Sequence, residues 1–172
     1  MNFVSKVVLA LALVAAVSIH GATAGQKTAV FPFDLRDADQ EGEMIPQFQE
    51  DDLRRLKLIA DELKSLMQKD GRYELVDLTP LAAEIEQASP FHKCDGCETP
   101  IAEKAGAELV VTGLAHKFSD ALISLQLYVR DVKTGEMKKT MSAAVQGNTD
   151  ELWLHGIRWL WKNRLSVEEK KN

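Results

Sequence analysis

The sequence predicts a single α/β domain, a mixed β-sheet of about five strands packed with amphipathic helices. A strand, a long helix and a second strand follow one another over residues 28–77, which is the order of a right-handed parallel crossover. After Gly113 the apolar residues recur at every second position, which indicates strands with one buried and one wet face. The chain has 172 residues, and we expect residues 25–165 to form this one domain.

The first half of the domain supplies the crossover. Residues 28–33 are expected to form a buried strand that stops pairing at Pro32, because proline cannot donate to a ladder. A long polar loop is expected over residues 34–50. Apolar residues at spacings of three and four then predict a helix over 51–68, with a face made of Leu53, Leu56, Ile59, Leu63 and Leu66. Asp70-Gly71 ends this helix, and residues 73–77 form the second strand.

The second half supplies two short helices, three strands and a final helix. Helical turns are expected after Thr79 and over 100–105, with a loop at 89–99 between them. Residues 109–114 read as a short apolar strand, and 123–130 and 137–145 as a hairpin across a turn at 133–136. Asn148 is the expected N-cap of the final helix, because Glu151 follows it as in a capping box. Residues 166–172 form a charged tail.

The first residues of the chain predict export. Lys6 precedes an apolar run at 7–19 that is too short to span a bilayer, and Ala22-Thr23-Ala24 has the pattern of a cleavage site. We therefore expect residues 1–24 to be a signal peptide, the mature chain to be periplasmic, and no membrane span to remain after cleavage. The formal net charge is −5 and Lys and Arg form no block, so no nucleic-acid binding is expected.

Several segments resemble an uncharacterised family of secreted proteobacterial proteins, a domain of unknown function. The most specific are Cys94-x-x-Cys97-Glu98 and the segment GNTDELW at 147–153. More distantly, the Gly-Ala-Glu at 106–108 and the Asp-Val-Lys-Thr-Gly at 131–135 are similar to the amino-terminal domain of TolB and to CsgG-like periplasmic domains. The resemblance implies a binding or assembly module of the cell envelope with an envelope protein as partner, a periplasmic quinoprotein dehydrogenase system being one candidate.

Cys94 and Cys97 are the two cysteines of the chain. In an oxidising compartment so close a pair is expected to form a disulfide. Two alternatives stay open. A Cys-x-x-Cys before a helix can lower the pKa of a thiol and act as a redox-active dithiol, and His92 can join both cysteines as ligands of a metal ion. Haem attachment is not expected, because Glu98 stands where a histidine is needed.

Residues 37–43 are the most acidic stretch of the chain. Asp37, Asp39 and Glu41, followed by Gly42, match the first half of a calcium-binding loop. Phe48 stands at position twelve of that pattern, where a bidentate glutamate is required. A solvated loop is therefore expected, and its acids are a candidate surface for a basic partner.

All three tryptophans lie in the final helix. The spacing predicts an apolar face made of Trp153, Ile157, Leu160, Trp161 and Leu165, which leaves Trp159 beside this face and partly exposed. An exposed tryptophan flanked by Arg158 and Lys162 is a candidate contact patch for a partner protein, because Trp and Arg are enriched in interface hot spots.

The sequence contains no recognisable catalytic motif. It has no Gly-x-Ser-x-Gly, no His-Glu-x-x-His, no phosphate-binding loop and no dinucleotide fingerprint, and no cofactor is expected. No nucleophile stands at a fixed spacing from His92, His116 or His155, and His116 is expected to face solvent. The expected function is a non-catalytic periplasmic binding or accessory module, with a thiol-disulfide redox protein or a metal-binding chaperone as alternatives.

Overall fold

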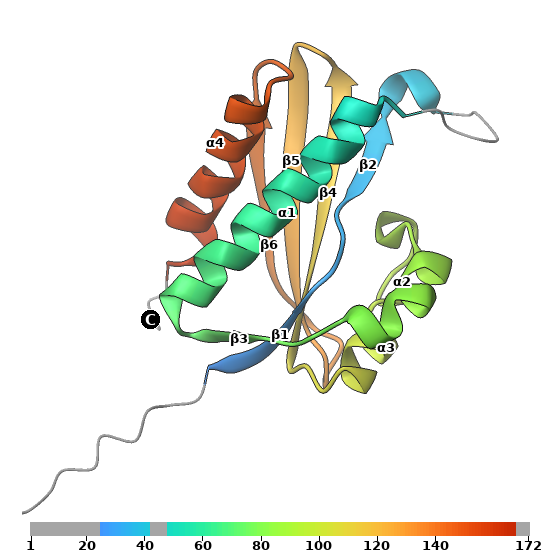
Figure 1. The fold of residues 1–172 in the computed structure, drawn as a ribbon, viewed down its shortest axis with the longest axis vertical. Coiled ribbons are helices and arrows are strands. Elements are labelled where there is room, and N and C mark those ends of the chain that lie inside the picture. The colour runs from blue at the N-terminus through green and yellow to red at the C-terminus, as the bar shows by residue number, and fades with distance from the viewer. Residues whose placement is uncertain (1–24, 42–47, 168–172) are drawn as a thin grey trace, which may run out of the picture.

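The computed structural model describes residues 25–41 and 48–167, so the predicted signal peptide lies outside the described residues. Six strands form one mixed sheet in the order β3-β1-β4-β5-β6, with β2 paired to β4 (Figure 1). This arrangement confirms the predicted α/β fold class. The strands are β1 (Gln26–Val30), β2 (Asp34–Asp37), β3 (Tyr73–Leu75), β4 (Leu109–Ser119), β5 (Leu122–Asp131) and β6 (Met137–Val145).

The predicted crossover and hairpin are both present. Helix α1 (Glu50–Asp70) connects β1 to β3, and these two strands pair in parallel. Strands β4, β5 and β6 pair antiparallel in chain order. Helix α1 ends at Gly71, which has a φ of 78°, a left-handed conformation that glycine adopts without a steric penalty.

The prediction of a loop from residue 34 onward is wrong at its start. Asp34–Asp37 form β2, which pairs in parallel with Leu114–Lys117 of β4. The chain leaves the ladder around Pro32 and then re-enters it beside the same neighbour. This is possible because β4 runs to Ser119, five residues beyond its predicted end, and so offers β2 a partner that the sequence pattern did not reveal.

Two hydrophobic cores lie on opposite faces of the sheet. Helices α1 and α4 (Asp150–Leu160) cover one face, and they contact each other as well as the strands (Figure 1). Helices α2 (Ala82–Ala88) and α3 (Thr99–Lys104) cover the other face near β1. Most of the predicted apolar face of each long helix is buried, whereas Leu66 and Trp161 are only partly buried. Leu53, placed by its spacing on the core face of α1, is 47% exposed.

A buried carboxylate joins α1, β4 and the start of α4. Asp52 is 1% exposed and accepts hydrogen bonds from Lys117 Nζ at 2.8 Å, Arg55 Nη1 at 2.8 Å and Asn148 Nδ2 at 2.9 Å. Burial raises the pKa of the Asp52 carboxyl, but the bonds from Lys117, Asn148 and Arg55 outweigh burial and hold this pKa below its usual value. The carboxylate therefore stays ionised inside the fold.

Asn148 has a role in this network that corrects the predicted helix cap. Its amide oxygen accepts from Trp153 Nε1 at 2.9 Å while its nitrogen donates to Asp52. Thr149 caps α4 instead, and its hydroxyl accepts from the backbone N–H of Leu152. Helix α4 continues as a π-helical turn at Trp161–Leu165. No helix of the described ranges is long and apolar enough to cross a membrane.

We expect Gly113→Ala to destabilise the domain by about 1–3 kcal/mol, the usual range for overpacking a core. A Cβ at this position would lie 2.5 Å from the Phe33 ring, which is itself buried. Urea unfolding measures the change, and Ser142→Ala on the exposed face of β6 is the control. Equal stability of the glycine and alanine proteins would show that the ring can move away at little cost.

We expect Asp52→Asn to lower the free energy of unfolding at pH 7 by about 3 kcal/mol, because it leaves Lys117 buried with a weaker set of partners. The folded-state pKa of Asp52 is depressed, so its stabilisation is complete above about pH 4 and is lost as the pH falls through the lower folded value. Unfolding measured from pH 7 down to pH 2 should show the two proteins converging in acid. A difference that is constant with pH would contradict the assignment.

Candidate functional site

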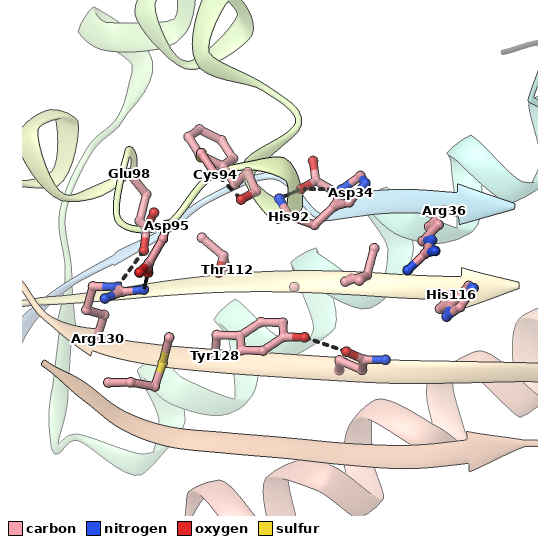
Figure 2. Close-up of a pocket in the computed structure, with 15 residues that line it drawn as sticks. Asp34, Arg36, His92, Cys94, Asp95, Glu98, Thr112, His116, Tyr128 and Arg130 are labelled. Carbon is pink, nitrogen blue, oxygen red and sulfur yellow. Dashed lines mark hydrogen bonds and ion pairs between the residues drawn. The ribbon is translucent and has the colours of Figure 1, made fainter. Parts of the chain in front are cut away.

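A polar groove lies on the face of the sheet that α2 and α3 leave uncovered. It encloses a cavity of about 350 Å³ between β4, β5 and the segment that carries the two cysteines (Figure 2). Its floor is formed by outward-facing side chains of the two strands, among them Thr112, Leu114, Gln126 and Tyr128. The alternation along each strand positions these groups, because every second residue faces away from the helices α1 and α4.

His92 and Asp34 form a pair at the mouth of this groove. One carboxylate oxygen of Asp34 accepts the backbone N–H of His92 at 2.9 Å and contacts its Nδ1 at 3.2 Å. Asp34 is buried and belongs to β2, whereas His92 lies in the short helical turn at Phe91–Lys93. A carboxylate on Nδ1 fixes the orientation of the imidazole and leaves Nε2 available for a ligand.

Arg130 fixes the opposite end of the groove. Its guanidinium donates to Glu98 Oε1 at 2.9 Å, Asp95 Oδ1 at 2.6 Å and the carbonyl of Gly135 at 2.7 Å. Burial lowers the pKa of Arg130, but the carboxylates of Asp95 and Glu98 more than offset burial and raise it. Strand β5 thus holds the cysteine loop through one side chain, as Figure 2 shows.

His116 lies inside the groove, not toward solvent as predicted. Its side chain is 13% exposed, its ring packs against Phe118 at a tilt of 40°, and its Nε2 is 3.7 Å from Glu41 Oε1. The same Glu41 oxygen accepts from Arg36 Nε at 2.7 Å. Burial and the charge of Arg36 lower the pKa of His116 below its ordinary value, which favours the neutral imidazole.

The groove is suited to recognition of a polar ligand. Tyr128 donates to Gln126, Arg130 pairs with Asp95 and Glu98, and His92 contacts Asp34. In the described part of the chain, His92 and His116 contact carboxylates, and the cysteines at the rim are joined to each other. The arrangement therefore offers oriented hydrogen-bond groups and no activated nucleophile among the residues that line it.

Cys94 and Cys97 are joined by a disulfide. Within residues 25–41 and 48–167, the group that brings three ligand atoms within 4.8 Å of one another is Cys94, Cys97 and Glu98. His92, the third member of the metal site considered from the sequence, pairs with Asp34 instead. Glu98 is itself bonded to Arg130, so a cation there would compete with the guanidinium for this carboxylate.

The three acids considered as a partner surface have different surroundings. Asp37 is buried, lies 3.7 Å from Lys117 Nζ and accepts the backbone N–H of Asp39. Asp39 lies in a short 3-10 turn that follows β2, and Glu41 is paired with Arg36. Of this stretch, Gly42 and Glu43 lie outside the described residues. The described acids therefore form part of a strand end and a turn.

The aromatic helix places its tryptophans as the spacing predicted. Trp153 is fully buried, Trp161 packs edge to face against Tyr73, and Trp159 is 38% exposed. Arg158 pairs with Glu62 of α1, and the guanidinium of Arg164 lies 5.5 Å from the centre of the Trp159 ring. Lys162, in the π-helical turn that follows α4, is exposed.

Sequence reasoning missed Asp34, Arg130 and Tyr128 as site residues. Asp34 was assigned to a loop, and the other two were read only as the wet face of a strand. One signal was available. Arg130 and Tyr128 are large polar residues on the outward positions of a strand whose neighbours Ser124 and Gln126 are smaller, which indicates a face that is partly covered.

Comparison with known proteins adds a family and a fold. Residues 26–165 match the family DUF3280, described as "Protein of unknown function (DUF2380)". The chain belongs to this family. No curated protein sequence matches it.

Solved structures share the architecture at low sequence identity. The LpoB C-terminal domain from Escherichia coli is 21% identical over 76% of this chain and 89% of that one, with a TM-score of 0.51. Lipoprotein GNA1162 from Neisseria meningitidis is 10% identical over 81% and 98%, also at 0.51. TolB from Acinetobacter baumannii matches at 13% identity over 80% of this chain and 28% of that one, with a TM-score of 0.42. The first two show a common fold.

We expect the double variant Cys94→Ser, Cys97→Ser to fold and to lose about 2 kcal/mol or less of unfolding free energy. The disulfide closes a short loop, and loop-closure entropy for so short a loop is small. Arg130 still holds Asp95 and Glu98 when the sulfurs are separated. Denaturant unfolding in oxidised and reduced buffer measures the effect, and global unfolding of the variant would contradict it.

Proposed function

We propose that this protein is an exported, non-catalytic module that binds a protein partner in the bacterial cell envelope. Its fold is shared with the LpoB C-terminal domain and with a lipoprotein, and its sequence begins with the pattern of a signal peptide. Both observations support an envelope location. A periplasmic quinoprotein dehydrogenase system is one candidate partner.

The observation that carries the binding role is the outer face of α4. The inner face of this helix already covers the sheet through Trp153, Ile157 and Leu160, which are fully buried. The outer face nevertheless exposes Leu152 and Trp159, each with more than a third of its surface in contact with solvent. Apolar area of this kind, surrounded by charged side chains, is typical of protein contact sites.

The charges around Trp159 are arranged for contact with an acidic surface. The guanidinium of Arg164 lies 5.5 Å from the centre of the Trp159 ring, Arg158 is held by Glu62 of α1 at 2.7 Å, and Lys162 is exposed. Burial of a tryptophan together with an arginine is the usual composition of an interface hot spot. We therefore assign the partner contact to Arg158, Trp159 and Lys162.

We expect Trp159→Ala to leave the fold intact and to weaken partner capture about tenfold, a loss typical of a hot-spot residue. The mature chain, residues 25–172, is immobilised and exposed to periplasmic extract of the source bacterium, and bound proteins are identified and titrated. Phe118→Ala, which removes an aromatic side chain of β4 that is 47% exposed, is the control.

Two outcomes would overturn this assignment. Unfolding of the Trp159→Ala protein would place the indole in the core, and unchanged capture would place the partner elsewhere. The Cys94→Ser, Cys97→Ser variant distinguishes a binding module from a redox protein, because a binding module still captures its partner without the thiols. Insulin reduction that depends on Cys97 would favour a thiol-disulfide enzyme instead.

A further inference from the structure

Strand β2 leaves part of the sheet edge open. Within the described residues β4 is the strand that pairs with β2, and Figure 1 shows no strand on its far side. An edge strand has backbone N–H and C=O groups that point away from the sheet and can pair with another chain. A cavity of about 590 Å³ lies along this edge, between β2, the first turns of α1 and the segment Ser89–Lys93.

The two sides of this cavity differ in chemistry. Leu53 and Leu56 of α1 line one side together with Leu35 of β2. Leu53 is the residue of the apolar helix stripe that remains 47% exposed, although burial of Leu56 shows that the stripe itself faces inward. Apolar area is thus left open at the point where an added strand would place a side chain.

The other side of the cavity carries charged side chains. Arg36 and Lys93 line it together with the acids Asp34, Asp37 and Glu41, and Lys93 is exposed. Asp37 lies 3.7 Å from Lys117 Nζ. Asp34 on the same side is already bonded to His92, and Glu41 to Arg36. No ion pair of Lys93 occurs among the residues that the structure describes. An incoming acidic side chain would therefore find a cation there.

Side chains of β2 point alternately to the two faces of the sheet, so one added strand would contact both sides of the cavity. Leu35 faces the core with α1, whereas Asp34 and Arg36 face the opposite side of the sheet. A strand added beside β2 has the same alternation, because successive side chains point to opposite faces. One set of its side chains meets Leu53 and Leu56, and the other set lies on the side of Lys93.

We propose that the free edge of β2 binds an extended segment of a partner protein, in which apolar and acidic residues alternate, as an additional strand. The inference rests on the proposed function, and it names the chemistry of the partner segment. The long edge strand β6 is a poorer site, because it carries Lys138 and Lys139, and Lys139 Nζ donates to the carbonyl of Val167. Lysines at an edge are a common protection against strand pairing.

Binding of a labelled peptide to the mature chain tests the proposal. The probe is a fluorescein-labelled peptide of about eight residues, the length of an ordinary strand, with alternating leucine and glutamate. Saturable binding is expected by fluorescence anisotropy. A leucine–lysine peptide should bind about tenfold more weakly, because it lacks the negative charge. A leucine–glutamate peptide with a central proline should also bind about tenfold more weakly, because proline has no backbone N–H to donate.

Matched variants locate the site. Leu53→Asp and Lys93→Glu should weaken the leucine–glutamate peptide about tenfold, and both side chains are exposed enough for the variants to fold. Lys138→Glu at the β6 edge should leave its affinity unchanged. Amide chemical shifts should change at residues 34–37 and 50–56 and not at 137–145.

Three results would overturn the proposal. They are the absence of saturable binding up to about 1 mM peptide, equal affinity for the leucine–lysine peptide, and amide shifts centred on β6. Each is distinguishable from failure of the proposed function. Capture of the envelope partner is tested by Trp159→Ala, whereas peptide binding is tested at Leu53 and Lys93.

Discussion

The buried carboxylate of Asp52 is the constraint on which the positions of the main elements depend. An ionised group inside a protein must be paired, since an isolated buried charge costs several kcal/mol. Asp52 meets this requirement with Lys117 from β4, Arg55 from its own helix and Asn148 from the turn before α4. The start of α1, the end of β4 and the start of α4 are therefore held at one place, and the helices can cover one face of the sheet.

The same constraint explains the length of β4 and the existence of β2. Lys117 reaches Asp52 because β4 continues in strand geometry beyond Leu114, with Lys117 directed inward and His116 outward. The extended part of β4 then supplies the partner for Asp34–Asp37. Asp37 adds a third carboxylate near Lys117, at 3.7 Å, next to Asp52 and Asp120. A single lysine thus links the core, the edge strand and the hairpin turn.

The two faces of the sheet have different roles. Helices α1 and α4 pack on one face, whereas α2, α3 and the cysteine loop cover only part of the other. What remains is a polar groove whose walls are fixed by Asp34 with His92 at one end and by Arg130 with Asp95 and Glu98 at the other. The open edge of β2 borders this groove, since both cavities include Asp34, Arg36 and His92. Surfaces held this rigidly lose little entropy on binding a partner.

The sequence by itself determined the features that depend on local periodicity. The α/β class, the long helix, the hairpin and the exposure of Trp159 beside a buried apolar face all follow from spacings of two, three or four residues. The disulfide was the first expectation from the close spacing of the two cysteines in an exported chain, and a redox dithiol and a metal site stayed open beside it.

Only the tertiary structure decided the pairings between distant residues. His92 and Asp34 are 58 residues apart, and Lys117 and Asp52 are 65 apart. Strand β2 is too short and too polar to be recognised without β4 beside it. Thr149 caps α4 in place of Asn148, because the amide of Asn148 is hydrogen-bonded to Asp52 and Trp153. Leu53 has the spacing of a core residue and remains exposed, because no helix or strand within residues 25–41 and 48–167 covers it. Periodicity fixes which face of an element is apolar, but packing decides what covers that face.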